Sequence, residues 1–118
     1  MTRMTRVALV LGILLPACAT VNAEHVLTGT PGPPFAGDVK IVIEGSPVSA
    51  PYQEVAIVTA TGQGAQALLP AILGALQSEA ARLGCNAVIR VRYDRGKVSA
   101  TATGVGVRME SQGAAAPR

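Results

Sequence analysis

Apolar residues recur at every second position early in the best-patterned part of the chain. Val39, Ile41 and Ile43 alternate with Lys40 and Glu44. Side chains two residues apart share a face of a strand, so this spacing predicts a half-buried first strand. A Gly-Ser-Pro run follows directly and ends the pattern.

The next segment, residues 52–61, is apolar on both faces. Val55 and Ile57 fall on one face, and Ala56, Val58 and Ala60 fall on the other. Apolar side chains on both faces are typical of a strand inside a sheet that is covered on both sides. We therefore expect an interior strand here.

Helical spacing replaces this pattern after Pro70. The apolar face comprises Ile72, Leu73, Leu76, Ala80 and Leu83. A 3.6-residue period over this length predicts an amphipathic helix of about four turns. Gly84 is suited to end the helix, and Asn86 is suited to the turn that follows.

Two more strands are predicted after the helix. Residues 87–94 alternate, with one face made of Ala87, Ile89, Val91 and Tyr93 and the other of Val88, Arg90, Arg92 and Asp94. A short turn containing glycine leads into residues 98–109, whose second face holds Ala100, Ala102, Gly104 and Gly106. Such small side chains permit close approach of another backbone or sheet.

These elements predict a single small α/β domain over residues 38–110. Its order is β-β-α-β-β, with a mixed sheet packed on one amphipathic helix. The strand-helix-strand part favours a right-handed crossover that makes its two strands parallel, and the last strand returns antiparallel. Residues 111–118 are expected to form a disordered tail.

Composition limits the size of the core. The chain has 118 residues, of which 49% are hydrophobic and 14% charged, so it should fold. Aromatic residues make up only 3%, so the core must come from Val, Ile, Leu and Ala. A small Ala-rich core buries little area per residue, which favours a homo-oligomer or another partner surface.

The amino-terminal segment has the order of an export signal. Arg3 and Arg6 precede an apolar run at residues 7–15, which small residues follow. The run is shorter than the ~20 residues that a membrane-spanning helix needs. Without these two arginines the net charge falls from +3 to +1, which gives no case for binding nucleic acid.

Leu15-Pro16-Ala17-Cys18 resembles the lipobox of bacterial lipoproteins. The resemblance implies that residues 1–17 are a signal peptide and that Cys18 carries the lipid anchor. Ala19 after the cysteine then implies the outer membrane, facing the periplasm. The alternative is ordinary secretory cleavage after Ala23, because the preceding residues also end in a small side chain.

Residues 18–37 are predicted to form a tether between the anchor and the domain. Three prolines and three glycines lie in this segment and disfavour helix and strand formation. Phe35 is expected to pack back on the domain. His25 lies in the segment with no orienting partner in view, so we expect it to be solvent-exposed and without a specific role.

Gly62, Gly64 and Ala67 match the Gly-x-Gly-x-x-Gly/Ala pattern of dinucleotide-binding loops. Asp94 follows at the end of the next strand, later than the usual position of the ribose-binding acid, and no second nucleotide-binding half is present. We therefore interpret residues 61–67 as a strand-to-helix loop and predict no cofactor.

The helix-to-strand junction resembles a known family. Residues 79–89 read Glu-Ala-Ala-Arg-Leu-Gly-Cys-Asn-Ala-Val-Ile, and residues 103–107 read Thr-Gly-Val-Gly-Val. They are similar to the Leu-Gly-Ala-Asn-Ala-Val-Ile and Gly-Thr-Ala-Val motifs of YbjQ-type proteins. The resemblance implies a compact α/β unit that forms rings in some members, and a related domain occurs in RcsF-type outer-membrane lipoproteins.

Cys85 stands where that family has Ala, and it has no cysteine partner once Cys18 is acylated or cut away. It is interpreted as a small buried group, with a reactive thiol as the alternative. A metal site needs several converging ligands, and Cys85 and His25 are far apart in sequence, so none is predicted.

The leading functional hypothesis is a non-enzymatic envelope lipoprotein that binds or assembles through its sheet surface. Its partners would be the membrane, further copies of the chain and an unknown protein. A redox or metal-responsive sensor that uses Cys85 is the alternative. A small enzyme that uses the loop at residues 62–67 is the third hypothesis.

Overall fold

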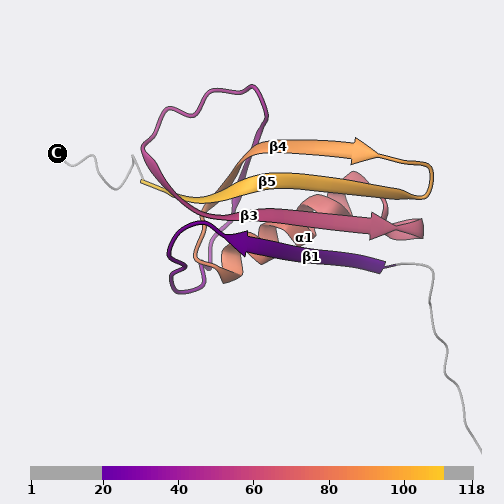
Figure 1. The fold of residues 1–118 in the computed structure, drawn as a ribbon, viewed down its shortest axis with the longest axis horizontal. Helices are drawn as coiled ribbons and strands as arrows, with labels where there is room; N and C mark the ends of the chain where they lie inside the picture. The colour runs from indigo at the N-terminus through magenta and orange to yellow at the C-terminus, as the bar shows by residue number, and fades with distance from the viewer. Residues whose placement is uncertain (1–19, 111–118) are drawn as a thin grey trace, which may run out of the picture.

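The computed structural model describes residues 20–110. Its elements are β1 (Thr20–Leu27), β2 (Lys40–Ile43), β3 (Tyr52–Gln63), the 3-10 turn η1 (Gly64–Gln66), α1 (Leu69–Arg82), β4 (Ala87–Arg95) and β5 (Ser99–Met109). The predicted class is confirmed: one small α/β domain has a mixed sheet packed on one helix (Figure 1).

The sheet has five strands in the order β1-β3-β5-β4-β2. All neighbours are antiparallel except β2 and β4, which are parallel. β5 lies between β3 and β4 and runs against both, so β3 and β4 are parallel to each other, as the crossover predicted. They are not neighbours, however, because the last strand enters between them.

The predicted tether is wrong for residues 20–27, which form the edge strand β1. This strand pairs with β3 along its whole length, from Thr20 opposite Gln63 to Leu27 opposite Ala56. The prolines and glycines that suggested a tether all come after Thr28, and residues 19–27 contain neither. The composition of the whole segment therefore failed to predict the strand at its start. The domain includes residues from Thr20 onward.

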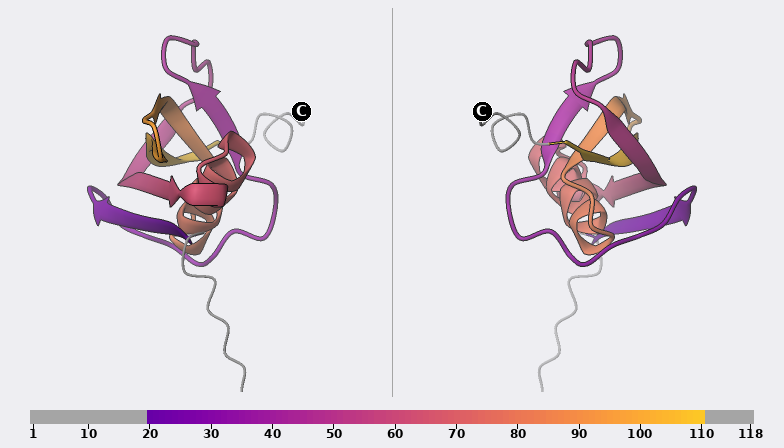
Figure 2. Two further views of the ribbon diagram at one scale, coloured as in Figure 1. Left: turned by 90° about the vertical axis from the view of Figure 1, so that its right-hand side faces the viewer. Right: turned by 90° about the vertical axis from the view of Figure 1, so that its left-hand side faces the viewer.

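Residues 28–37 are not a free spacer either, because they carry the chain around the carboxyl end of α1 (Figure 2). The Gly32 amide donates to the Leu83 carbonyl and the Phe35 amide to the Ala81 carbonyl, both at 2.9 Å. These bonds satisfy carbonyls that the end of a helix leaves without helical partners. The Phe35 side chain packs on the core, as predicted.

The main core lies between α1 and one face of the sheet, which curves around the helix (Figure 2). Ile72, Leu76 and Ala80 of α1 are fully buried. The small residues of β5 lie under the helix, as their size predicted, and a Cβ at Gly106 would lie 2.8 Å from Cys85 Sγ. A larger side chain there would separate the layers.

A bulge in β4 changes the faces predicted for its residues. Arg90 has φ 55°, and the register with β5 shifts between Ile89 and Arg92. Ile89 therefore shares the face away from α1 with Arg92, whereas Val88 and Val91 both enter the main core. Strict alternation fails here because a bulge adds one residue to one strand.

The junction after α1 follows the prediction at Gly84 and adds a role for Asn86. Gly84 has φ 88°, its amide donates to the Ala81 carbonyl and the Cys85 amide donates to the Ala80 carbonyl. This is the Schellman arrangement of a helix end. The Asn86 side chain then donates to the Met109 carbonyl and accepts from the Met109 amide, at 2.8 and 2.7 Å.

Candidate binding surface

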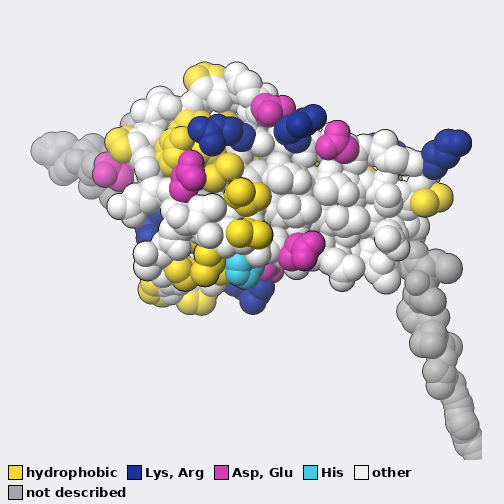
Figure 3. Space-filling model, in the orientation of Figure 1, with side chains coloured by type: hydrophobic (Ala, Val, Ile, Leu, Met, Phe, Trp, Pro, Cys, Tyr) yellow, Lys and Arg dark blue, Asp and Glu magenta, His cyan; other side chains and the backbone are white. Residues whose placement is uncertain are grey.

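The face of the sheet opposite α1 is open over β1, β3 and β5. Val26, Ile57 and Val105 lie side by side across these three strands, since Val26 is opposite Ile57 and Ile57 is opposite Val105. Val26 is 66% and Ile57 43% exposed. Figure 3 shows this face, with exposed apolar side chains near its centre. The prediction that β3 is covered on both faces is therefore wrong at Ile57.

Four threonines continue this face toward the other end of the strands. Thr59 lies opposite Thr103, and Thr61 lies opposite Thr101. The hydroxyl oxygens of Thr61 and Thr101 are 3.3 Å apart. Short side chains in register make this part of the face flat and uncharged. We call the three apolar residues and the four threonines together the open face.

Charged side chains border the open face, and most of them are already paired. On the β4 side, Arg92 Nε lies 3.3 Å from Glu44 Oε1 and an Arg90 nitrogen lies 3.9 Å from Glu54 Oε2. Glu24 lies on the β1 side. These exposed pairs contribute little stability, but they leave the border without a strong excess of either sign. An uncharged face with a mixed border does not suit nucleic acid.

A second, smaller core closes the face beyond the open part. It contains Val42, Ala87, Ile89 and Val107, against which Val48 and Tyr52 pack from the β2–β3 connection and the start of β3. The open face is thus limited to β1, β3 and β5. Its apolar residues adjoin this core through Val105, which packs against it.

Cys85 is fully buried and free, as the interpretation of a small buried group predicts. Burial raises the pKa of its thiol, an effect that the nearby Arg108 guanidinium opposes. A neutral, inaccessible thiol is a poor nucleophile and a poor metal ligand. Its position therefore disfavours the sensor hypothesis. Cys18, the other predicted site residue, lies outside the described residues.

His25 is not an unpartnered side chain, so that prediction is wrong. Its Nδ1 lies 2.6 Å from Glu79 Oε2, and Arg82 donates to Glu79 Oε1 at 2.6 Å. The Glu79 side chain is only 8% exposed. The Glu79–Arg82 pair was visible as an i, i+3 spacing, but His25 is 54 residues away and its β1 position was not predicted.

The pKa of Glu79 is lowered by this arrangement. Burial alone raises it, but the hydrogen bonds and charges of Arg82 and His25 outweigh that effect. A carboxylate that orients a histidine also occurs in catalytic triads, where the histidine activates a nucleophile. Within residues 20–110 no hydroxyl or thiol forms a hydrogen bond with His25. We therefore interpret the cluster as a link between β1 and α1.

The glycine pattern does not form a phosphate-binding loop. Gly62 lies inside β3, where a Cβ would clash with the Gln66 carbonyl oxygen. The Gly64 amide donates to the Val98 carbonyl at 3.0 Å, and the Ala67 amide donates to the Gly64 carbonyl at 3.1 Å. Amides used in this way are not free to bind phosphate. Gly62 is thus required by close packing, and Gly64 has φ 59° in the turn that follows.

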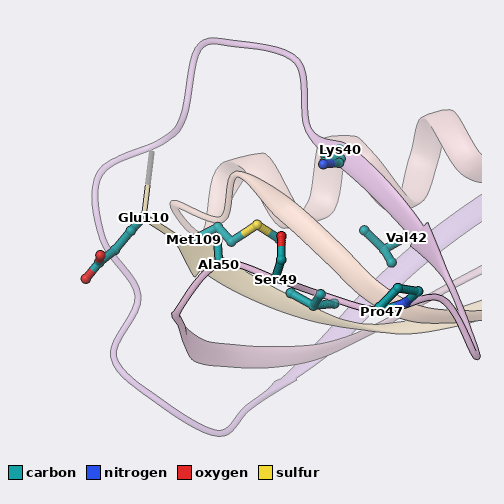
Figure 4. Close-up of a pocket in the computed structure, with 8 residues that line it drawn as sticks. Lys40, Val42, Pro47, Ser49, Ala50, Met109 and Glu110 are labelled. Carbon is teal, nitrogen blue, oxygen red and sulfur yellow. The ribbon is translucent and has the colours of Figure 1, made fainter. Parts of the chain in front are cut away.

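The described part of the chain also has a small cavity, of about 220 Å³, beside β2 (Figure 4). Lys40 and Glu110 lie on different sides of it, with Val42 and Met109 in its wall. Ligand pockets usually measure ~300–1,000 Å³, so it is small for a cofactor. Across residues 20–110, no three His, Cys, Asp or Glu side chains form a metal-binding group, and no helix is long and apolar enough to span a membrane.

No known family model, curated protein or solved structure matches this chain. The resemblance to YbjQ-type proteins therefore stays a prediction.

Proposed function

We propose that this chain is a non-enzymatic binding or assembly module of the bacterial cell envelope, anchored to a membrane by a lipid on Cys18. The observation that supports binding is the open face, which exposes Val26 and Ile57 on a flat, uncharged part of the sheet. Contiguous apolar side chains rimmed by polar ones mark sites of protein association. A second copy of the chain is the first partner to test, because the core is small.

The position of β1 supports processing at Cys18 rather than after Ala23. Cleavage after Ala23 would remove residues 20–23, which make half of the β1 pairing with β3. It would also remove the Ala23 side chain, which packs against the main core. Cleavage before Cys18 leaves the whole strand in place. Processing as a lipoprotein is therefore the route that preserves the fold.

The position of β1 also determines how closely the anchor would hold the domain to the membrane. Cys18 precedes Thr20, the first residue of β1, by two residues. Two residues span at most about 7 Å when fully extended. A lipid on Cys18 would hold the domain directly at the bilayer surface, without a spacer. Two or three acyl chains make such attachment stable, whereas one does not.

Intact mass and membrane fractionation of the full chain test the anchor. We expect wild type to carry added lipid mass and to fractionate with membranes, and we expect Cys18→Ser to lose both. Cys85→Ala is the matched control, since it removes the other cysteine and should change neither result. Equal mass and equal fractionation of wild type and Cys18→Ser would refute the anchor.

Light scattering and cross-linking of the purified protein test assembly through the open face. Ile57→Glu places a charge in the centre of the face and should weaken self-association at least ~10-fold, which corresponds to about 1.4 kcal/mol. Ile43→Glu is the matched control, because Ile43 is 53% exposed but lies on β2 at the far edge. A wild type that stays monomeric at every concentration would refute assembly and leave a different protein as the partner.

A further inference from the structure

Three segments meet at the end of the domain where β1 begins. Thr20 pairs with Gln63, Gln63 pairs with Ser99, and the Gly64 amide donates to the Val98 carbonyl at 3.0 Å. Figure 1 shows this end on the right, with the start of β1, the end of β3 and the β4–β5 turn. We call residues 20–21, 63–69 and 95–99 the amino-terminal tip.

The amino-terminal tip is unusually apolar for an exposed end of a domain. It holds four of the eight large apolar side chains that are exposed within residues 20–110. They are Val21 at 37%, Leu68 at 54%, Leu69 at 42% and Val98 at 75% exposed. The other four are spread over β1, β2 and β3.

Two of these residues occupy positions where polar residues are favoured. Leu68 is the N-cap residue of α1, and its side chain makes no capping hydrogen bond. Ser, Thr, Asp or Asn at that position would stabilise the helix. Val98 lies in the β4–β5 turn, where Gly, Asn and Asp are usual. Residues that are unfavourable for their local structure and gain no packing contact are expected at functional sites.

The charges of the amino-terminal tip have one sign. Arg95 ends β4, Lys97 lies in the β4–β5 turn, and the three segments contain no Asp or Glu. The nearest acidic residue, Asp94, directly precedes Arg95. Both side chains are exposed, and neither forms an ion pair with another described residue. Apolar side chains flanked by cations are the composition that binds the surface of an anionic bilayer.

We infer that the amino-terminal tip rests on an anionic phospholipid bilayer, with Leu68, Leu69 and Val98 in the headgroup region and Arg95 and Lys97 beside the phosphates. The direction of docking rests on the proposed anchor, because the chain from Cys18 enters the domain at this end. Long cationic side chains place their aliphatic stems along apolar surface and their charged groups in water, which suits residues at the depth of the lipid headgroups.

This orientation has a consequence for the open face. The strands lie along the long dimension of the domain, so that they extend from the amino-terminal tip to the opposite end (Figure 1). A domain that rests on this end therefore stands upright, and Val26 and Ile57 face sideways above the bilayer. The membrane then leaves the open face accessible to a protein partner.

Tryptophan fluorescence tests the docking, because the chain has no Trp of its own. Val98→Trp places a reporter in the amino-terminal tip, and Gln53→Trp places one at the exposed start of β3, near the opposite end. The full chain of each variant is reconstituted in anionic phospholipid vesicles with brominated acyl chains. Circular dichroism establishes that both variants keep the fold.

We expect the Val98→Trp emission to shift to shorter wavelength and to be quenched at least about twofold more than that of Gln53→Trp, since interfacial groups insert ~5–10 Å. Equal quenching of the two variants would overturn the proposal. In the Val98→Trp background, Arg95→Gln with Lys97→Gln should reduce quenching, whereas Lys40→Gln on β2 should not. Unchanged quenching on removal of both tip cations would overturn the anionic specificity.

Intact mass of the same samples separates this inference from the anchor. Quenching of Val98→Trp without lipid mass would support the amino-terminal tip as a bilayer-binding surface and refute lipidation of Cys18. Lipid mass without quenching would retain the anchor and overturn the docking of the tip.

Discussion

Glu79 is the one buried charged side chain among the described residues, and it connects α1 to the edge strand. Its carboxylate accepts from Arg82 on the same helix and meets His25 from β1, both at 2.6 Å. A buried carboxylate without these partners would be costly, so each partner stabilises the position of the others. The attachment of β1 therefore depends partly on a charge.

Glu79→Gln should lower the free energy of unfolding at pH 7 by about 1–3 kcal/mol. The folded pKa of Glu79 is below its usual value of 4.5, so its stabilising contribution is present above that value and is lost as pH falls through the folded pKa. Denaturant unfolding of wild type and Glu79→Gln at pH 7 and at about pH 3 measures the loss of stability and its dependence on pH. Glu24→Gln is the control, because Glu24 is an exposed carboxylate on β1, next to His25. If Glu79→Gln lowered the free energy of unfolding by the same amount at both pH values, this account would be contradicted.

Cys85 should be protected in the folded protein. Its side chain is fully buried against Gly106, and burial raises the pKa of its thiol. We expect a bulky thiol reagent to label it slowly in buffer and rapidly in denaturant. Cys18→Ser removes any signal from the other cysteine. Rapid labelling in buffer would reopen the sensor hypothesis.

The elements with strong periodicity were predicted closely. Pro70 and the regular apolar spacing placed α1, and Gly84 marked its end, because these are local properties of the chain. The entry of β5 between β3 and β4 is a long-range pairing that no local pattern encodes. The open face depends on that order and on β1, so the sequence predicted a sheet surface but not its residues.

The bulge in β4 was invisible in the sequence because its residue is Arg90 and not a glycine. Arg90 has φ 55°, a left-handed conformation that is strained for a side chain with a Cβ. The bulge turns Arg92 toward the open side and places Val91 in the core. An element-level feature thus decides which side chains border the candidate surface.

Arg90→Gly should leave the stability unchanged or raise it by up to about 1 kcal/mol, because glycine adopts positive φ without strain. Arg92→Gly should lower it by a similar amount, because glycine in a regular strand weakens the sheet. Thermal or denaturant unfolding of the two variants compares them directly. Equal destabilisation by both would show that no bulge lies at Arg90.

At the scale of the whole molecule, the anchor, the edge strand and the open face form one arrangement. β1 carries Val26 of the open face and His25, which contacts the buried Glu79 side chain. The cysteine proposed to hold the lipid lies two residues before the start of β1. The strand that the sequence suggested was a spacer thus connects the membrane to the binding surface. Any processing that shortens it should affect the fold as well as the location.

Chains that begin at Ala19 and at Glu24 test this dependence, since the second corresponds to cleavage after Ala23. We expect the chain from Glu24 to be less stable by at least about 1–3 kcal/mol, the cost of losing buried hydrogen-bond partners. It loses the pairing of residues 20–23 with residues 60–63 of β3 and the packing of Ala23. Denaturant unfolding and amide exchange of β3 measure the loss. Equal stability of the two chains would show that the first half of β1 is dispensable, and the structural support for processing at Cys18 would then be lost.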